Sequence, residues 1–389
     1  MAVYTWGLGK TGQLGTGRLE TEYTPQLANR TAEGLELEAV KYISCGALFT
    51  AVVTVDGNVF TTGYGKYGRL GLGDTENDAC LFTEVSSFGK VNQVSCGSWH
   101  TVAVTDAGQV YVWGYKKACG DCLLLDSRAA SQSGGSLLGY PTLVPFDVGV
   151  KVVGVSCGHN YTFVWATNGS VYSWGSGHYG VLGHGSEDDV PVPTKVEHLL
   201  ARAVASVGAG HDHCGIVTHD GLLFMTGKGS DGALGQGESR LMNALLPVLC
   251  RCEWKITAVS CSKGEHHAHT LALTKEGQVL AWGDGCKGKL GLGDEEKRFV
   301  PTLIPQEHFH NEIVVSVSAG GIHSAAATAE GNVYTWGCGS DGRLGHPEGQ
   351  GHKYFFRSKV PRKVEQLPET FSGKAVVSAA YYHTAAIVP

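Results

Sequence analysis

Short runs of alternating apolar and polar residues, each bounded by glycine, fill the chain. One copy of the pattern comprises residues 91–95, 101–105, 109–113 and 141–144. These runs are rich in β-branched and aromatic residues, and no segment shows a convincing helical period, so the pattern predicts strands. The fourth run begins at a proline, which predicts an outer edge strand, where a missing N–H group costs least.

The same four runs return seven times. The motif Trp-Gly-x-Gly-x-x-Gly-x-Leu-Gly opens at positions 6, 62, 113, 174, 226, 282 and 336, with Thr replacing Trp at 62 and 226 and a degraded copy at 113. A second motif, Val-Ser-Cys-Gly-x-x-His-Thr at residues 94–101, precedes every opening except the first, and its His position always lies 13 residues before the opening. Four strands repeated seven times predict an all-β fold, a seven-bladed β-propeller of four-stranded blades.

The two ends of the chain carry complementary halves of one repeat. His383 would need its opening motif beyond residue 389, whereas the opening at Trp6 has no preceding His motif. We therefore expect the last blade to combine residues 376–378 and 384–388 with residues 2–6 and 25–27, which leaves no open sheet edge between the termini. The whole chain, residues 1–389, is predicted to form a single domain.

Both motifs and their seven copies resemble the regulator-of-chromosome-condensation (RCC1-like) repeat family over essentially the whole chain. The resemblance implies the propeller fold. For function it implies several classes, which include a guanine-nucleotide exchange factor for the GTPase Ran, ubiquitin-ligase modules, ciliary scaffolds and a plant photoreceptor. The photoreceptor class needs clustered tryptophans on one loop face, whereas Trp99 stands alone there, so the sequence disfavours this class.

Composition narrows the class of partner. The chain has 30 basic and 36 acidic residues and a net charge of −6, which argues against a dedicated duplex-DNA binder. No apolar run reaches the length of a membrane span, and the first residues show no signal peptide. We expect an intracellular protein of the nucleus or cytoplasm, a monomer that binds another protein rather than nucleic acid or a membrane.

Motifs for catalysis, cofactors and metals have simpler structural interpretations. The Gly-x-Gly-x-x-Gly spacing recurs six times with no following helix, so it predicts turns rather than a dinucleotide site. The repeat cysteine exchanges with alanine and the repeat histidine with Phe49 or Tyr161, which predicts free, buried thiols and packed imidazoles. Cys119 and Cys122 have metal-ligand spacing but no second pair, and no nucleophile elbow exists. We therefore predict no catalytic residue, metal or cofactor.

Loops of one type share one face of a propeller, so the variable residues between Gly and His of the second motif should form a ring. We call this surface the ring face. Structural demands are weakest there, and exposed aromatics beside polar groups favour an interface hot spot. The candidate partner-binding residues on this face are Leu48, Trp99, His159, Asn160, His211, Asp212, His267, Ile322, Tyr381 and Tyr382.

Two other segments depart from the repeat. After Trp113 the glycine ladder is lost, and this wedge-like loop offers Tyr115, Lys116, Lys117 and Asp121. The resemblance implies a role for it, because the matching unit of the Ran exchange factor carries a wedge that opens the GTPase's nucleotide site. A basic stretch holds Lys353, Arg357, Lys359, Arg362 and Lys363. It could meet phosphate or an acidic surface, although a solvated outer strand explains it more simply.

Two functions remain open from the sequence. One is a small-GTPase regulator or guanine-nucleotide exchange factor, which needs differential binding and no covalent chemistry. The other is a non-catalytic scaffold or substrate-recruiting module, for example in a ubiquitin-ligase or chromatin-associated assembly. The resemblance implies weak or absent exchange on Ran, because Asn160 and Ser98 stand where the Ran exchange factor has acidic residues, and its ring-face His falls near His267 or Ala268.

Overall fold

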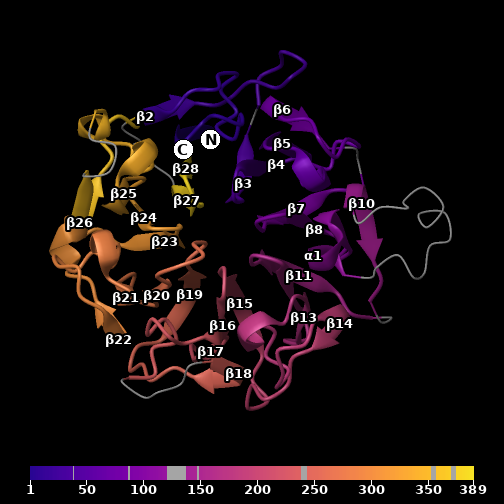
Figure 1. Cartoon of the computed structure of the whole chain (residues 1–389), viewed down its shortest axis with the longest axis vertical. Coiled ribbons are helices and arrows are strands. Elements are labelled where there is room, and N and C mark those ends of the chain that lie inside the picture. Colours follow the sequence, from indigo (N-terminus) through magenta and orange to yellow (C-terminus); the bar gives the residue numbers. More distant parts are fainter. Residues whose placement is uncertain are drawn as a thin grey trace.

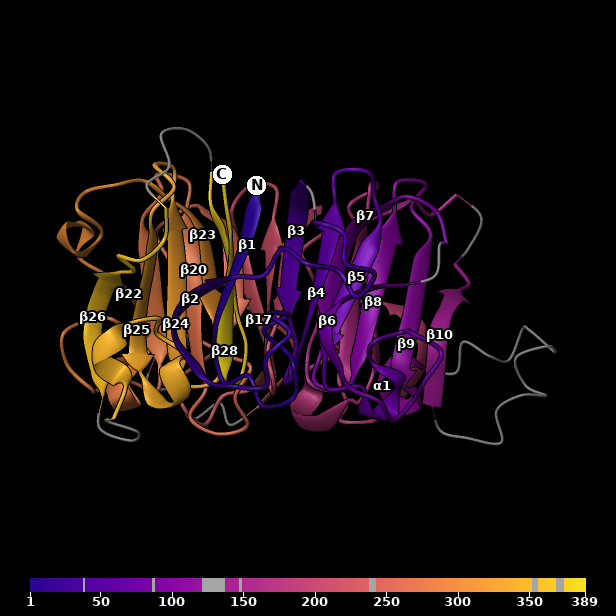
Figure 2. The same ribbon diagram turned by 90° about the horizontal axis from the view of Figure 1, so that it is seen from above.

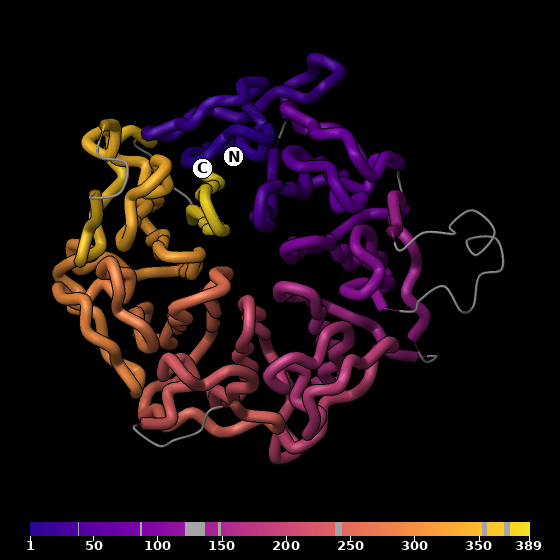
Figure 3. The backbone as a smooth tube through the Cα atoms, viewed as in Figure 1, coloured from indigo at the N-terminus to yellow at the C-terminus, as the bar shows by residue number. Residues whose placement is uncertain are grey.

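Seven four-stranded antiparallel sheets form a closed ring in the computed structural model of the protein (Figure 1). The structure describes residues 1–37, 39–85, 88–120, 137–146, 149–237, 243–351, 356–368 and 374–389. Figure 3 shows that the chain travels round the ring once, so six blades consist of consecutive strands. The predicted seven-bladed propeller is confirmed.

The blades are numbered from the first complete one, and each has its first strand innermost. Blade one contains β3 (Val40–Cys45), β4 (Phe49–Thr54), β5 (Val59–Gly63) and β6 (Ala79–Glu84), and blade two contains β7 (Val91–Cys96), β8 (His100–Thr105), β9 (Val110–Tyr115) and β10 (Leu137–Val144). Blade three contains β11 (Val152–Cys157), β12 (Tyr161–Ala166), β13 (Val171–Gly175) and β14 (Val190–Lys195), and blade four contains β15 (Val204–Ala209), β16 (His213–Thr218), β17 (Leu223–Lys228) and β18 (Asn243–Leu249). Blade five contains β19 (Ile256–Cys261), β20 (His269–Thr274), β21 (Val279–Gly283) and β22 (Arg298–Leu303), and blade six contains β23 (Val314–Ala319), β24 (His323–Thr328), β25 (Val333–Cys338) and β26 (Arg357–Lys363).

Helical structure among the described residues is limited to single turns. The short helix α1 (Lys116–Cys119) follows the third strand of blade two. The 3₁₀ turns are η1 (Lys66–Gly68), η3 (His178–Gly180), η4 (Cys286–Gly288), η5 (Gln306–Phe309), η6 (Ser340–Gly342) and η7 (Pro347–Gly349).

Blade seven is built from both ends of the chain, as predicted. Its strands lie in the order β2 (Glu22–Leu27), β1 (Ala2–Gly7), β28 (His383–Val388) and β27 (Val376–Ala379). The β1–β28 ladder is unbroken from the pair Ala2 and Val388 to the pair Gly7 and His383. Figure 2 shows both termini at the end of the strands opposite to α1. Closing the ring in this way pairs the two terminal strands and removes a free sheet edge.

The predicted start of the fourth strands is wrong by several residues. Strand β10 begins at Leu137 rather than at Pro141, and Pro141 lies where the β9–β10 register shifts, between Leu138 and Thr142. Blades three to seven repeat this arrangement, as with Pro25 inside the corresponding shift of blade seven, whereas the fourth strand of blade one has the shift without a proline. A proline has no N–H group to give to a ladder, so it occupies the bulge of an outer strand instead of its first position.

The tryptophan that opens a repeat joins its blade to the preceding one. Trp113 is fully buried, and its indole N–H donates to the carbonyl oxygen of Arg69 in blade one (2.9 Å). Where threonine replaces tryptophan, the Thr62 hydroxyl donates to the carbonyl of Gly12 (2.9 Å). Gly71 has a φ of +74°, and a Cβ there would lie 2.7 Å from the Trp113 indole nitrogen. The ladder glycine therefore serves both a turn and the close packing between blades.

The repeat histidines also link neighbouring blades. His323 is fully buried, and its Nε2 lies 2.8 Å from the Thr384 hydroxyl of blade seven. That hydroxyl donates to the carbonyl of Arg343 (2.8 Å), so it accepts from the imidazole N–H. The corresponding pairs are His100–Thr162, His213–Thr270, His269–Ser324 and His383–Thr50. The packing interpretation of these histidines is confirmed.

The repeat cysteines are buried, as expected of small apolar side chains. Cys45, Cys96, Cys157 and Cys261 are at most 2 % exposed, and burial raises the pKa of each thiol. None of the cysteines in the described ranges takes part in a disulfide. Cys122 lies outside the described residues. The exchange of Cys with Ala among the copies of the repeat therefore reflects core packing rather than redox chemistry.

Candidate partner-binding site

A row of aromatic rings crosses the ring face. The edge of Trp99 meets Tyr67 at 5.3 Å between ring centroids on one side and His159 at 6.0 Å on the other. His159 stacks on His211 at 4.0 Å, and His211 meets Tyr381 at 6.4 Å. Because Trp99 belongs to the β7–β8 loop and Tyr381 to the β27–β28 loop, the row connects blade two to blade seven through blades three and four.

Arg69 holds the Trp99 end of the row in place. Its side chain is fully buried, with the guanidinium carbon 4.7 Å from the Trp99 ring centre. The guanidinium donates to the carbonyl oxygens of Ser98 (2.9 Å) and Lys66 (2.8 Å). Burial lowers the pKa of Arg69 to about 10, which still leaves the group charged at neutral pH. Trp99 is half-buried and packed, so it is ordered before any partner arrives.

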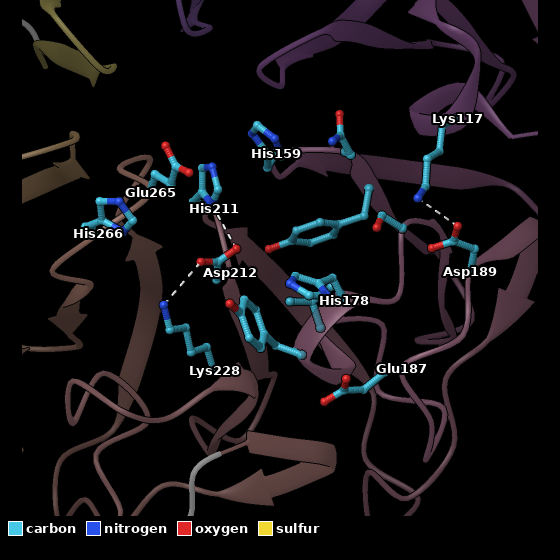
Figure 4. Close-up of a pocket in the computed structure, with 15 residues that line it drawn as sticks. Lys117, His159, His178, Glu187, Asp189, His211, Asp212, Lys228, Glu265 and His266 are labelled. Atoms are coloured by element: carbon cyan, nitrogen blue, oxygen red, sulfur yellow. Dashed lines mark hydrogen bonds and ion pairs between the residues drawn. The ribbon is translucent and has the colours of Figure 1, made fainter.

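A hollow of about 400 Å³ opens beside this row, between blades three and four (Figure 4). Lys117 from α1 reaches one side of it, and His159, Asn160, His211 and Asp212 from the ring loops reach the other. The remaining lining residues are Tyr161, Ser176, His178, Tyr179, Val181, Glu187, Asp189, Lys228, Glu265 and His266. The structure thus brings the wedge-like loop and two adjacent ring loops around one site.

Ion pairs organise the charges in the hollow. Asp212 lies 2.8 Å from Nδ1 of His211 and 3.7 Å from Nζ of Lys228, and Lys117 lies 2.9 Å from Asp189. Burial alone would raise the pKa of Asp212, but the hydrogen bond from His211 and the nearby Lys228 charge hold it below its usual value. Figure 4 shows these pairs on opposite sides of the hollow.

His159 occupies the middle of the row as a neutral imidazole. Burial and the neighbouring His211 lower its pKa to about 4. Its Nδ1 lies 2.8 Å from the Ser98 hydroxyl, and its Nε2 lies 3.3 Å from the Trp99 indole nitrogen, which donates to it. An Nε2 that accepts requires the proton on Nδ1, so Ser98 is the acceptor of the second bond.

Several predicted ring-face residues lie away from the hollow. Leu48 and Ile322 are half-buried, and their carbonyl oxygens accept from the N–H groups of Tyr64 and Cys338. His267 is exposed in the enlarged loop after β19, with its Nδ1 3.6 Å from an Asp284 carboxylate oxygen. Tyr382 stacks on Tyr381 at 5.2 Å and lies under Arg343.

The other two predicted segments have different outcomes. In the wedge-like loop, Tyr115 ends β9 and packs on Tyr67, and Lys116 and Lys117 begin α1; Asp121 lies outside the described residues. In the basic stretch, Arg357, Lys359, Arg362 and Lys363 belong to β26, the outer strand of blade six, whereas Lys353 lies outside the described residues. Arg357 and Lys359 share Glu295, and Arg362 pairs with Glu348, so two carboxylates contact three of these cations.

The hollow contains residues that the sequence analysis missed. Tyr179 lies in η3, the 3₁₀ turn that follows the third strand of blade three, and has a φ of +58°. Lys228, at the end of β17, has its Nζ 5.0 Å from the centre of the Tyr179 ring. Asp189 accepts from the backbone N–H of Gly177 (3.1 Å). Tyr179 and Lys228 stand at variable positions of the glycine ladder, whereas Asp189 directly precedes β14. Departures from the repeat consensus in the ladder are the signal that could have identified the first two residues.

The described ranges contain neither a cluster of metal-ligand side chains nor a membrane-spanning helix. Their His, Cys, Asp and Glu side chains include no group of three placed to hold a metal ion. Their helices are single turns, and none is long and apolar enough to cross a bilayer.

Comparison with protein families gives an unambiguous result. The model of the Regulator of chromosome condensation (RCC1) repeat matches residues 2–53, 56–104, 107–165, 168–217, 276–327 and 330–387. The chain belongs to the RCC1 repeat family. A second RCC1 repeat model matches residues 40–69, 256–289 and 314–343.

Individual relatives share the repeat over most of this chain. The ultraviolet-B receptor UVR8 of Arabidopsis thaliana is 34% identical over 308 residues, which cover 78% of this chain and 66% of the receptor. The human E3 ubiquitin-protein ligase HERC2 is 29% identical over 350 residues, which cover 88% of this chain and 7% of the ligase. This RCC1 protein therefore spans less than two thirds of the length of either relative.

Solved structures reproduce the whole ring. Human WBSCR16 superimposes with a TM-score of 0.84 at 23% identity, and all of both chains is covered. Prp20p of Saccharomyces cerevisiae superimposes with a TM-score of 0.80 at 20% identity over 99% of this chain and 90% of Prp20p. At these identities the similarity establishes the fold of the RCC1 propeller and no more.

Proposed function

We propose that the ring face binds a protein partner and that the protein regulates a small GTPase, as a guanine-nucleotide exchange factor with weak or no activity on Ran. The observation that carries this proposal is the hollow, which Lys117 of the wedge-like loop lines together with Asn160 and Asp212 of two ring loops. A GTPase seated on the ring face would then meet the wedge-like loop at the edge of its contact area.

Exchange demands no covalent step. The propeller must bind the nucleotide-free GTPase more tightly than the loaded one, because only differential affinity shifts a two-state equilibrium. Ordered side chains are suited to this task, since they lose little conformational entropy on binding. Trp99 clamped by Arg69, and Asp212 held by His211, meet this requirement.

Charge also favours a protein with basic side chains. Four carboxylates line the hollow, at Glu187, Asp189, Asp212 and Glu265, against the two ammonium groups of Lys117 and Lys228. A partner's lysine or arginine would find carboxylate acceptors there, and charge-assisted hydrogen bonds are about twice as strong as neutral ones. We assign less affinity to the basic stretch on β26, because Arg357, Lys359 and Arg362 already pair with Glu295 and Glu348.

The comparison with Prp20p supports the GTPase class, since that protein is described by its binding to Gsp1p and histones. Asn160 argues against full activity on Ran. It presents an amide where the Ran exchange factor, by the resemblance, presents a carboxylate. The proposed compartment is the nucleus or the cytoplasm, and the proposed form is a monomer.

The alternative is a non-catalytic recruiting module. The similarity to HERC2, which is named as an E3 ubiquitin-protein ligase, supports it. The neutral aromatic row from Trp99 to Tyr381 also supports it, because such a row is suited to an interface without a wedge. Under this alternative the partner binds whether or not a nucleotide is present.

One experiment separates the two functions. The protein is immobilised and challenged with a panel of small GTPases, each nucleotide-free, GDP-loaded or GTP-loaded, and release of a fluorescent nucleotide is measured in parallel. A regulator captures one GTPase preferentially in the nucleotide-free state and accelerates release. Capture of no GTPase in any state would favour the recruiting module.

A further inference from the structure

The seven innermost strands enclose a lumen of about 430 Å³ along the axis of the ring. Its wall is formed by β3, β11, β15, β19, β23 and β27, with β7 packed between β3 and β11. A volume more than ten times the roughly 30 Å³ that one water occupies in the liquid leaves room for a small solute together with several waters. The lumen is distinct from the hollow on the ring face.

A ring of serine hydroxyls lines this lumen. In the repeat motif, the Ser44 hydroxyl accepts from the backbone N–H of Cys96 in the next blade, at 2.9 Å. The same contact recurs for Ser156 with Ala209, Ser260 with Ala319, Ser318 with Ala379 and Ser378 with Cys45, each at 2.9 Å. All five serines line the lumen. Ser44 and Ser378 also hydrogen-bond with the thiols of Cys96 and Cys45, whereas for Ser156, Ser260 and Ser318 no acceptor for the hydroxyl hydrogen is present among the described residues. The hydroxyls of these three serines can therefore donate to a solute inside the lumen.

A lysine closes the ring-face end. The enlarged loop after β19 places Lys263 over the lumen, with its backbone N–H bonded to the carbonyl of Gly320 (3.1 Å). Its Nζ donates to the carbonyl oxygens of Cys157 (2.7 Å) and Ala209 (3.0 Å). A third N–H of the ammonium is left over, since an ammonium group has three donors. The side chain is surrounded by protein but keeps some surface toward the lumen.

No carboxylate balances this charge in the described part of the chain. Neither Asp nor Glu lines the lumen, and Lys263 takes part in no ion pair there. A second lysine, Lys374, precedes β27 at the opposite end of the lumen. Burial lowers the pKa of Lys263, as expected when an ammonium loses water without gaining a carboxylate. A buried unpaired charge is costly, and a bound anion would offset that cost.

We propose that the lumen is a binding site for one small tetrahedral oxyanion, phosphate or sulfate, held between the Lys263 ammonium and the serine hydroxyls. The ammonium and the free hydroxyl hydrogens supply donors, which fits a ligand rich in acceptor oxygens such as sulfate or hydrogen phosphate. The inference rests on the lumen alone and does not depend on the partner of the ring face. Among the described residues no carboxylate lines the lumen, so none of them would repel an anion there.

The first test uses the full-length protein and inorganic phosphate. Equilibrium dialysis with radioactive phosphate, at constant ionic strength set with sodium chloride, should show saturable binding of one phosphate per chain. Sulfate should compete, whereas an equal increase in chloride should not. Absence of saturable phosphate binding, or displacement by chloride at equal concentration, would overturn the proposal.

The second test places the ligand. Lys263→Met keeps the length of the side chain and removes its charge, and we expect at least a tenfold loss of phosphate affinity. The control is Lys275→Met, at an exposed lysine of the β20–β21 turn, which should bind as the wild type does. Equal affinity in Lys263→Met and wild type would move the anion out of the lumen and overturn the assignment. If Lys263→Met fails to fold, Lys263→Gln, which keeps hydrogen-bonding capacity, serves in its place with the same expected loss.

Discussion

His159 and His211 stack with their ring centroids 4.0 Å apart, although they belong to different blades. This contact joins the Trp99 half of the aromatic row to the Tyr381 half. Asp212, which pairs with His211, lines the same hollow as Asn160. The two ring loops therefore act as one surface, and a partner that reaches Asp212 also meets the aromatic row.

The first prediction concerns which residues contribute most of the affinity for the protein partner. Trp99→Ala removes the ring that Arg69 and Tyr67 support, and Tyr382→Ala removes the ring beside Tyr381. If either is an anchor, partner binding should weaken by about 2 kcal/mol, measured by titration calorimetry once a partner is known.

The matched control reverses charge on the outer strand of blade six. Lys359→Glu and Arg362→Glu break pairs with Glu295 and Glu348 that are already exposed. These changes should alter mainly the salt dependence of binding, because rim charges act on association more than on affinity. A large affinity loss there, with none at Trp99 or Tyr382, would move the site to the basic stretch.

The second prediction concerns Asn160. It lines the hollow, and its Oδ1 is buried without a hydrogen-bond partner among the described residues. Replacing the amide by a carboxylate supplies a charge-assisted hydrogen bond, about 1.5–3 kcal/mol, or roughly 10- to 150-fold in rate if it forms in the exchange intermediate. Asn160→Asp should therefore accelerate fluorescent-nucleotide release from Ran, whereas the wild type should be slow. Fast release by the wild type would contradict the prediction.

The sequence predicted the fold well because the residues that repeat are those whose side chains connect neighbouring blades. Trp113, His323 and Gly71 each make a contact that one residue type satisfies best, so the same residue types recur from copy to copy. The site was predicted only in part. Lys228 ends the third strand of blade four and Asp189 directly precedes the fourth strand of blade three, and their approach to the ring loops depends on how adjacent blades pack.

The lumen was missed for a related reason. The serine of each second motif lies in a predicted strand, and the local sequence does not show that five such hydroxyls meet at one axis. Lys263, the residue that enters the lumen, has no local feature that distinguishes it from a solvated lysine.

The third prediction tests closure by both termini. Deleting residues 1–6 strips β1 from its partners β2 and β28 and removes Trp6, which is fully buried and donates to the Arg343 carbonyl (3.0 Å). The melting temperature of the whole body should fall cooperatively, since blade seven then has an open gap. Scanning calorimetry measures this. A variant that loses only the exposed Met1 is the control, and unchanged melting after the longer deletion would refute a shared blade.

The fourth prediction concerns acid stability, and it rests on the histidines that join the blades. Burial lowers the pKa of His100 to about 3, of His213 to about 4 and of His383 to about 3. Their Nδ1 atoms are buried without partners in the described structure, so protonation would create a buried N–H with no acceptor. Between roughly pH 6.5, the ordinary histidine pKa, and the folded values near 3 to 4, the unfolded chain binds more protons than the folded one. The stability conferred by these neutral histidines is therefore complete above about pH 6.5 and is lost as the pH falls toward 4. Each such histidine contributes up to about 1.4 kcal/mol per pH unit to the pH dependence of the unfolding free energy.

The test replaces one of these histidines by phenylalanine, which blade one already has at the equivalent position, Phe49. His213→Phe should reduce the slope by the contribution of one histidine, whereas His219→Phe, at an exposed position, should leave it unchanged. Urea unfolding at pH 7, 6 and 5 provides the measurement, and a slope in His213→Phe equal to that of the wild type would show that these imidazoles do not control the acid stability.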